Sequence, residues 1–158
     1  MRYFTAALWL SEGPASQRRW AGAVARYWKQ LEKLLTTLDA RSQRFFRNVS
    51  LHDGWVLGIS LGTGRRGRSM TLTMEVEAPE QDRVYQLGYD ELSRFELNRV
   101  GEQVLFDERD QVFGTWGYDE LTLLPSGAYR HEVLFSSGTT LLVEFRRFRV
   151  VSKKTVPA

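Results

Sequence analysis

The apolar residues of this chain change their spacing once, just after residue 48, and that change limits the folds open to it. From Pro14 to about Asp39 they recur every three or four residues, which predicts an amphipathic helix with one wide apolar face. Its apolar positions are Trp20, Val24, Tyr27, Trp28, Leu31, Leu34, Leu35 and Leu38. Pro14 suits the first turn, where the N–H that proline lacks would have no helical partner. Residues 40–49 favour a second short helix that presents Phe45 and Phe46.

Beyond this point apolar and polar residues alternate, as they do in strands with one buried face. The first run contains Trp55, Leu57, Ile59 and Leu61, and the second contains Met70, Leu72, Met74 and Val76. A loop rich in Gly and Arg joins the two runs, so we predict a long hairpin with one buried face. Further strand patterns cover residues 84–87, 92–97, 104–106, 112–116, 118–124, 128–135 and 140–150.

Short strands without helices between them favour antiparallel pairing over parallel β–α–β units. We therefore predict an α+β fold, in which the N-terminal amphipathic helix packs on a twisted, mostly antiparallel sheet of roughly six to eight strands. A length of 158 residues suits a single domain. Within it we expect a helical portion over residues 1–49, the antiparallel sheet over 50–150 and a basic tail over 151–158.

The chain contains no cysteine, which excludes disulfides, thiolate metal sites and a cysteine nucleophile. Its first ten residues hold one Arg and a short apolar run that Thr5 interrupts, unlike a secretory signal. No stretch approaches the roughly 18 apolar residues of a membrane span. We therefore expect a cytoplasmic protein with no membrane partner.

Charge is distributed unevenly along the chain. Residues 1–68 carry 12 basic and 4 acidic side chains, residues 69–145 carry 5 and 15, and residues 146–158 carry 5 and none. One interpretation is that a basic helical layer covers an acidic sheet and neutralises it. The other is that an acidic face receives a basic partner, since complementary potentials speed encounter and select partners. Nucleic acid is not expected as a partner, because no Lys/Arg stripe is interleaved with aromatic residues on one element.

Two short motifs match catalytic patterns but lie in the wrong structural context. Residues 58–62 fit the G-x-S-x-G nucleophile elbow, which needs a strand, a sharp turn and a helix. Here Ser60 falls inside a strand pattern. Residues 62–69 nearly fit a phosphate-binding loop, with Arg68 at the lysine position, but a strand pattern follows instead of a helix. We interpret this segment as a basic hairpin loop.

A few polar residues remain as candidates for chemistry. His52 and Asp53 resemble the metal-binding dyad of phosphohydrolases, or they close the turn into the first strand, with Asp53 accepting backbone N–H groups. His131 alternates with the apolar residues of its strand and so lies on the apolar face, which is typical of a histidine in or beside the core. A metal site that His131 shares with His52 remains an alternative. Asp119 and Glu120 are adjacent in a strand pattern and should point to opposite faces, which argues against a catalytic pair.

The order of these segments carries a resemblance. The chain opens Met-Arg-Tyr-Phe-Thr, has a helical segment, and reads Leu-His-Asp-Gly at residues 51–54 before the alternating hairpin. It resembles a bacterial family of unknown function whose members open Met-Lys-Tyr-Phe-Thr and carry a Leu-His-Asp-Ala step, so Gly54 stands where Ala is usual. The chain closes with Tyr-Asp-Glu-Leu at residues 118–121, Tyr-Arg-His-Glu-Val-Leu-Phe at 129–135 and Leu-Leu-Val-Glu-Phe at 141–145. Over the strand region it is similar to an immunity-protein family of polymorphic toxin systems. The resemblance implies a helix-plus-sheet fold and a protein-binding role, without catalytic residues.

The leading hypothesis is a non-catalytic, protein-interaction domain without cofactor or metal. In its finer form, the protein is of the immunity type and neutralises a basic partner such as a toxin domain. The acidic stretch from Glu75 to Asp110 is then the expected binding surface, with Asp107 and Glu108 beside Asp110.

Two alternatives come from other classes of protein. One is a small metal- or ligand-dependent enzyme, which requires four residues to converge in one pocket. These residues are His52, Asp53, Glu120 and His131. The other is an adaptor whose basic helix binds membrane lipid or nucleic acid through Arg18, Arg19, Arg26 and Lys29, with strong salt dependence.

Overall fold

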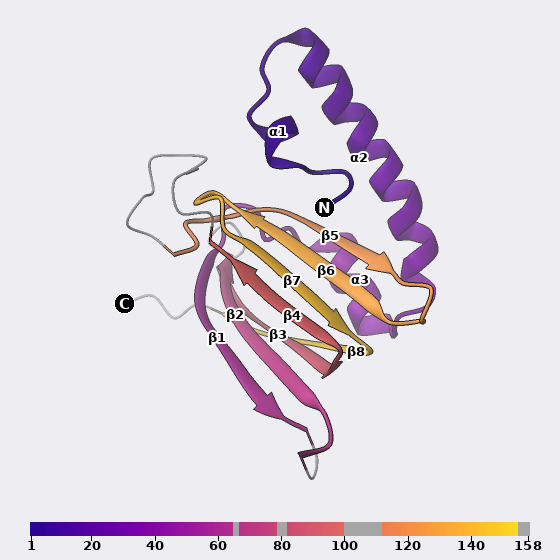
Figure 1. Cartoon of the computed structure of the whole chain (residues 1–158), viewed down its shortest axis with the longest axis vertical. Coiled ribbons are helices and arrows are strands. Elements are labelled where there is room, and N and C mark those ends of the chain that lie inside the picture. The colour runs from indigo at the N-terminus through magenta and orange to yellow at the C-terminus, as the bar shows by residue number, and fades with distance from the viewer. Residues whose placement is uncertain (65–66, 79–81, 100–111, 155–158) are drawn as a thin grey trace.

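The computed structural model describes residues 1–64, 67–78, 82–99 and 112–154, and in these residues three helices precede eight strands (Figure 1). The helices are α1 (Ala6–Trp9), α2 (Pro14–Leu35) and α3 (Ala40–Asn48). The strands are β1 (Trp55–Thr63), β2 (Met70–Ala78), β3 (Arg83–Leu92), β4 (Arg94–Asn98), β5 (Trp116–Leu123), β6 (Tyr129–Phe135), β7 (Thr140–Phe145) and β8 (Arg147–Lys154). The fold class is α+β, as the sequence predicts.

Helices α2 and α3 both begin at the residues that the sequence predicts. Pro14 is the first residue of α2, and Gly13 caps it with a φ of +88° that favours glycine. The helix ends at Leu35, four residues before the predicted end, and Asp39 instead starts α3. The Asp39 carboxylate accepts the backbone N–H groups of Arg41 and Ser42, at 2.9 and 3.1 Å. Such a cap stabilises a helix by about 1 kcal/mol.

The strands form two four-stranded antiparallel sheets, in the orders β1-β2-β3-β8 and β4-β7-β6-β5. The chain passes from one sheet to the other at Ser93, between β3 and β4, and again at Arg146, between β7 and β8. Backbone hydrogen bonds connect the two corners. The Ser93 N–H donates to the carbonyl of Glu144 (2.9 Å), and the Arg146 N–H donates to the carbonyl of Asp90 (3.1 Å). The strands therefore make one ribbon folded at a corner, with β1 and β5 at its two ends.

Three sequence predictions about the strands need correction. The run predicted over residues 140–150 is broken at Arg146, where the chain changes sheet. In the run predicted over 112–116, Thr115 forms an isolated bridge with Trp55, and β5 begins only at Trp116. The basic tail predicted over 151–158 is wrong for its first four residues, because β8 continues to Lys154, opposite Arg83 of β3. The remaining tail residues, 155–158, and the strand predicted over 104–106 lie outside the described residues.

The core fills the space between the two sheets. Leu72, Met74 and Val76 of β2 are fully buried, as their alternation predicts. At the β8 side, α3 inserts Phe46 between the sheets, with its ring 4.9 Å from that of Phe148 in one sheet and 5.7 Å from that of His131 in the other. A short helix thus closes one open side of the two-sheet core with aromatic side chains.

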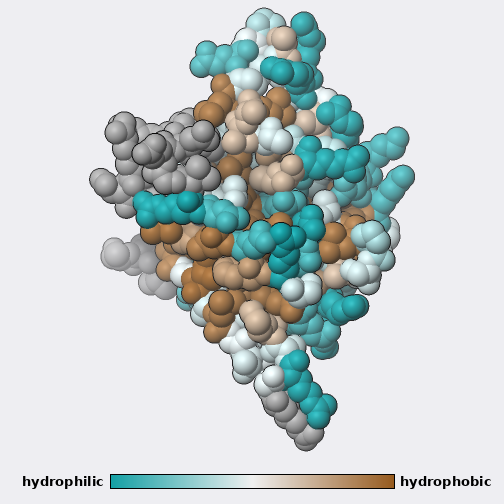
Figure 2. All heavy atoms as spheres, in the orientation of Figure 1, coloured by the Kyte–Doolittle hydropathy of each residue, from teal (hydrophilic) through white to brown (hydrophobic). Residues whose placement is uncertain are grey.

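Strand β1 does not bury the face that its alternation predicts. Trp55, Leu57 and Leu61 are 42%, 54% and 53% exposed. A bulge between Val56 and Gly58 shifts the parity of the strand, and β1 lies at the edge of its sheet. Figure 2 shows hydrophobic residues gathered on the face formed by β1–β4.

In the described strands, four acidic residues pair with arginines of the sheets: Asp90, Glu91, Glu96 and Glu144. Asp90 of β3 binds Arg149 of β8 at 2.7 Å, and Glu144 of β7 binds Arg130 of β6 at 2.6 Å. The cationic face of α2 stays exposed instead of covering the sheet. Its members are Arg18, Arg19, Arg26, Lys29 and Lys33. Ion pairs within the sheets therefore compensate part of the acidic charge, and α2 does not cover it as one interpretation of the sequence suggested. None of the described helices combines the length and apolar character needed to cross a membrane.

Candidate functional site

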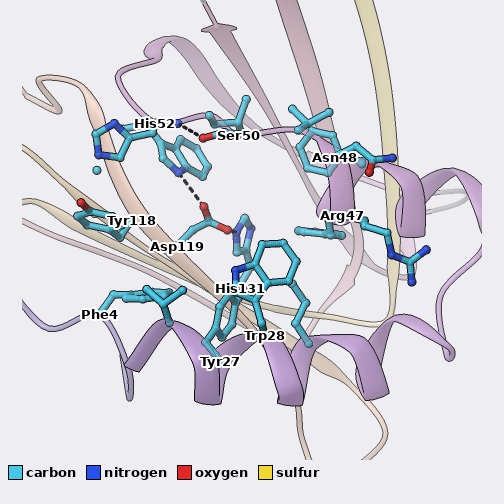
Figure 3. Close-up of a pocket in the computed structure, with 18 of the residues that line it drawn as sticks. Phe4, Tyr27, Trp28, Arg47, Asn48, Ser50, His52, Tyr118, Asp119 and His131 are labelled. Carbon is cyan, nitrogen blue, oxygen red and sulfur yellow. Dashed lines mark hydrogen bonds and ion pairs between the residues drawn. The ribbon is translucent and has the colours of Figure 1, made fainter. Parts of the chain in front are cut away.

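A pocket of about 360 Å³ lies where α2, α3 and β5 meet (Figure 3). Its walls are rich in aromatic residues and come from the N-terminal segment, α2, α3, the loop after α3 and β5. The aromatic residues of the lining include Phe4, Trp20, Tyr27, Trp28, Trp116 and Tyr118. This volume is near the lower end of the range for small-ligand sites, about 300–1,000 Å³.

Helix α2 reaches the pocket because it lies along the free edge of β5. The Tyr27 hydroxyl accepts the backbone N–H of Leu121 at 3.0 Å, and the Gln30 side-chain amide donates to the Leu121 carbonyl at 3.3 Å. These two side chains satisfy edge groups that another strand would otherwise pair. The same face of the helix also carries Val24, one turn before Tyr27, and Trp20, two turns before it, and both line the pocket.

Glu120 holds the N-terminal segment against β5. Its fully buried carboxylate accepts the backbone N–H groups of Arg2, Tyr3 and Phe4, at 2.7, 2.6 and 2.6 Å. The Phe4 ring then packs 5.1 Å from that of Tyr27, in an edge-to-face arrangement. Because all three contacts go to the backbone of this chain, Glu120 shapes one wall of the pocket and does not face the ligand space.

Asp119 faces the pocket because of a bulge at Gly117, between Trp116 and Tyr118. A Cβ on Gly117 would overlap the ring of Trp9 and lie 2.6 Å from the carbonyl oxygen of Leu134, so only glycine fits there. The bulge places Trp116 and Asp119 on the same face of β5. The indole N–H of Trp116 donates to one carboxylate oxygen of Asp119, at 3.0 Å.

The second oxygen of Asp119 binds Nε2 of the buried His131, at 3.0 Å. Nδ1 of His131 lies 2.8 Å from the Tyr89 hydroxyl. Burial, and then the negative charge of Asp119, raise the pKa of Tyr89 well above its ordinary value of 10.0. A tyrosine hydroxyl can donate to Nδ1 while the Nε2–H group donates to Asp119, so Tyr89 and His131 together can orient this carboxylate.

Asp119 is thus held at the pocket by two ring nitrogens, those of Trp116 and His131. Its side chain is 30% exposed, and it is the one acidic residue among those that line the described pocket. Arg47, also at the lining, has its guanidinium 3.0 Å from the Glu32 carboxylate. A carboxylate with lone pairs to spare, surrounded by aromatic faces, suits a cationic group.

His52 lines the same pocket from the loop after α3. Its Nδ1 is 3.0 Å from an oxygen of Asp53, and its ring is 5.1 Å from that of Tyr118. Asp53 adopts a φ of +61° in the turn into β1, and its own N–H donates to the carbonyl of Trp116 at 2.8 Å. The predicted turn is present, but the Asp53 carboxylate pairs with His52 and not with the backbone N–H groups that we expected.

The residues of the enzyme hypothesis do not all meet. His52 and His131 line one pocket, whereas Asp53 and Glu120 are not among its lining residues. In the part of the chain that the structure describes, no group of three or more His, Cys, Asp or Glu residues could hold a metal ion. The expected acidic binding residues Asp107, Glu108 and Asp110 lie outside the described residues.

Sequence reasoning set Asp119 aside, although it did place Asp119 and Glu120 on opposite faces. The available signal was Gly117, since an isolated glycine within an alternating run indicates a bulge that changes which residues share a face. The two rejected motifs behave as predicted. Ser60 lies within β1 opposite Thr73, and the Gly/Arg loop leads into β2 instead of a helix.

No protein-family model matches the chain, and no match is found among curated proteins. The resemblance described above therefore stays a prediction. The structure does explain Gly54, which stands where the resembling sequences have Ala. A Cβ at this position would lie 2.7 Å from the carbonyl oxygens of both Leu51 and Glu77.

Proposed function

We propose that this chain is a non-catalytic protein-interaction domain, whose pocket receives a positively charged side chain of a basic protein partner. One observation carries the proposal. Asp119 is fixed by hydrogen bonds from Trp116 and His131, at 3.0 Å each, and faces a pocket with aromatic walls.

A lysine or arginine side chain matches this pocket in both of its parts. Its apolar stem can lie against aromatic walls while its charged end meets the carboxylate. Each aromatic face beneath the cation contributes about 0.5–2 kcal/mol, depending on how far water is excluded. Because Asp119 already holds its orientation, binding does not have to order it.

The mouth of the pocket supports a protein partner over a free small molecule. Trp28 of α2 lines the pocket and is nevertheless 41% exposed, contrary to the burial that its helical spacing predicts. Exposed tryptophan beside a cavity is typical of an interface, where its large area becomes buried on binding. The acidic balance of residues 69–145 favours a basic partner.

The test uses n-butylammonium and n-butanol, which share an apolar stem and differ in charge. Each is titrated into the ¹⁵N-labelled protein while the indole N–H signal of Trp116 is followed. We expect saturable shifts with n-butylammonium, a loss of affinity of about tenfold or more in Asp119→Asn, and little change in Asp53→Asn, whose carboxylate is exposed. Equal shifts with n-butanol, or equal affinity in Asp119→Asn, would overturn the proposal.

The finer form of the proposal is that the partner is a toxin domain that this protein neutralises. The charge balance and the resemblance to an immunity-protein family support it. A partner captured by the wild-type protein and by Asp53→Asn, but not by Asp119→Asn, is expressed in a host cell with and without this chain. Growth arrest only in its absence supports neutralisation. A partner without toxicity contradicts this finer form alone.

A further inference from the structure

Within the described residues, the outer edge of β1 lacks the features that usually protect an edge strand. Its only described neighbour on that side is the single bridge from Trp55 to Thr115. The strand holds no proline and no charged residue over its nine positions. Edge strands usually carry a lysine, a proline or a covering element, because free N–H and C=O groups pair readily with another chain.

The hydrophobic side chains of this edge are also unusually open. Leu61 is 53% exposed and lies on the face of the sheet that points to the core, since it pairs with the fully buried Leu72. Met70, at the start of β2, is 47% exposed on the same face. An apolar strip therefore follows the free backbone edge, and a strand added there would cover it.

We infer that β1 pairs with β1 of a second copy of this chain, in an antiparallel, two-fold arrangement. A strand added to a sheet must keep the apolar faces on one side, and alternate residues share a face. Pairing Leu61 with Leu61 of the second copy meets this condition and places Ile59 opposite Thr63. The two sheets then join into one, with the regular ladder of Gly58–Thr63 at its centre.

Charge favours a second copy as the occupant. The β1–β2 hairpin is basic at its tip, where Arg68 lies, and acidic at its base, where Glu77 lies opposite Trp55. In the two-fold register the tip of each copy comes level with the base of the other. Arg68 of each copy then lies at the same level as Glu77 of the other copy, on the far sides of the two uncharged β1 strands. These two pairs of opposite charges favour self-association.

Sedimentation velocity from low to high micromolar concentration tests the inference. We expect the wild-type protein to convert from monomer to dimer, and Leu61→Lys to weaken the dimer at least about tenfold, because two like charges would face each other. Val151→Lys is the matched control and should dimerise like the wild type, since Val151 is 50% exposed on the opposite edge strand, β8.

A charge exchange at the exposed tip gives a second test that leaves the core untouched. Arg68→Glu should weaken the dimer at low salt, and Arg68→Glu combined with Glu77→Lys should restore it. A wild-type protein that stays monomeric at all concentrations overturns the inference, as does unaltered dimerisation of Leu61→Lys. Open-ended polymers also overturn it, because a two-fold pairing closes after two copies.

Discussion

The two end strands of the folded ribbon, β5 and β1, face the same physical problem and meet it differently. Each is an edge strand with a bulge beside a glycine, Gly117 in β5 and Gly58 in β1. Along β5, Tyr27 and Gln30 of α2 bind the backbone of Leu121, and Trp9 packs on Gly117. Around Gly58, in contrast, no atom lies within 4 Å of where a Cβ would stand.

This difference explains why the pocket and the open strand lie at opposite ends of the ribbon. A helix that covers a strand edge with side chains stands further off than a paired strand would, and the space between them can remain partly open. At β5 that space is lined by the aromatic residues of α2 and by Asp119. At β1 the free backbone and the exposed leucines form a surface instead of a cavity.

Among single substitutions, we expect the largest loss of stability at Glu120, which holds the N-terminal segment against β5. Glu120→Ala leaves the N–H groups of Arg2, Tyr3 and Phe4 without their acceptor, the first two partly buried and the third fully buried. We expect the free energy of unfolding to fall by about 3–5 kcal/mol, since each unpaired buried group costs about 1–3 kcal/mol and water replaces part of the loss. Urea denaturation measures it.

Two controls make this measurement specific. Glu120→Gln retains a carbonyl oxygen and should lose clearly less stability than Glu120→Ala. Leu61→Ala, at the uncovered end, should change the free energy of unfolding by less than about 1 kcal/mol, because the side chain is already half exposed. A loss below about 1 kcal/mol in Glu120→Ala would show that the N-terminal segment is not held by this carboxylate.

The spacing of apolar residues was sufficient to predict the helices and strands, but not to predict which strand edges are covered. Spacing predicted α2, α3 and the β1–β2 hairpin, because burial of one face leaves a period of 3.6 or 2 in the residues themselves. The exposure of Leu61 depends on which strands cover which, and pairing order leaves no such period. The position of Asp119 depends on one extra residue at Gly117, and the donors that orient it come from residues distant in sequence, such as His131.

The two bulge glycines give the most direct comparison of the edges. Gly117→Ala should destabilise the protein by about 1–3 kcal/mol, because its Cβ would lie 2.6 Å from the backbone oxygen of Leu134. Gly58→Ala meets no atom within 4 Å and has no positive φ, so its stability should be unchanged or raised by up to about 1 kcal/mol. Equal effects of both substitutions in thermal or urea unfolding would contradict the contrast between the edges.

Alkaline pH should destabilise the protein through two buried tyrosines, Tyr27 of α2 and Tyr89 of β3, and not through β1. Burial first, and then the charge of Asp119, raise the pKa of both Tyr27 and Tyr89 above the ordinary 10.0. Above pH 10.0 the unfolded chain loses these phenolic protons while the folded protein keeps them, so the unfolded state binds fewer protons. The free energy of unfolding then falls as pH rises, by at most about 1.4 kcal/mol per pH unit for each tyrosine.

Below the ordinary tyrosine pKa of 10.0 the contribution of both residues is fully present, so the fall should begin only near that pH. Urea denaturation at a series of alkaline pH values measures the slope, and Tyr27→Phe should reduce it. The β1 strand contains no titratable group, so the effect of Leu61→Ala on stability should be the same throughout that range. Phenolate absorbance of the folded protein gives the opposing outcome. If all tyrosines ionise near pH 10.0, the Tyr27 hydroxyl is not buried against Leu121. In that case α2 does not cover the β5 edge through Tyr27.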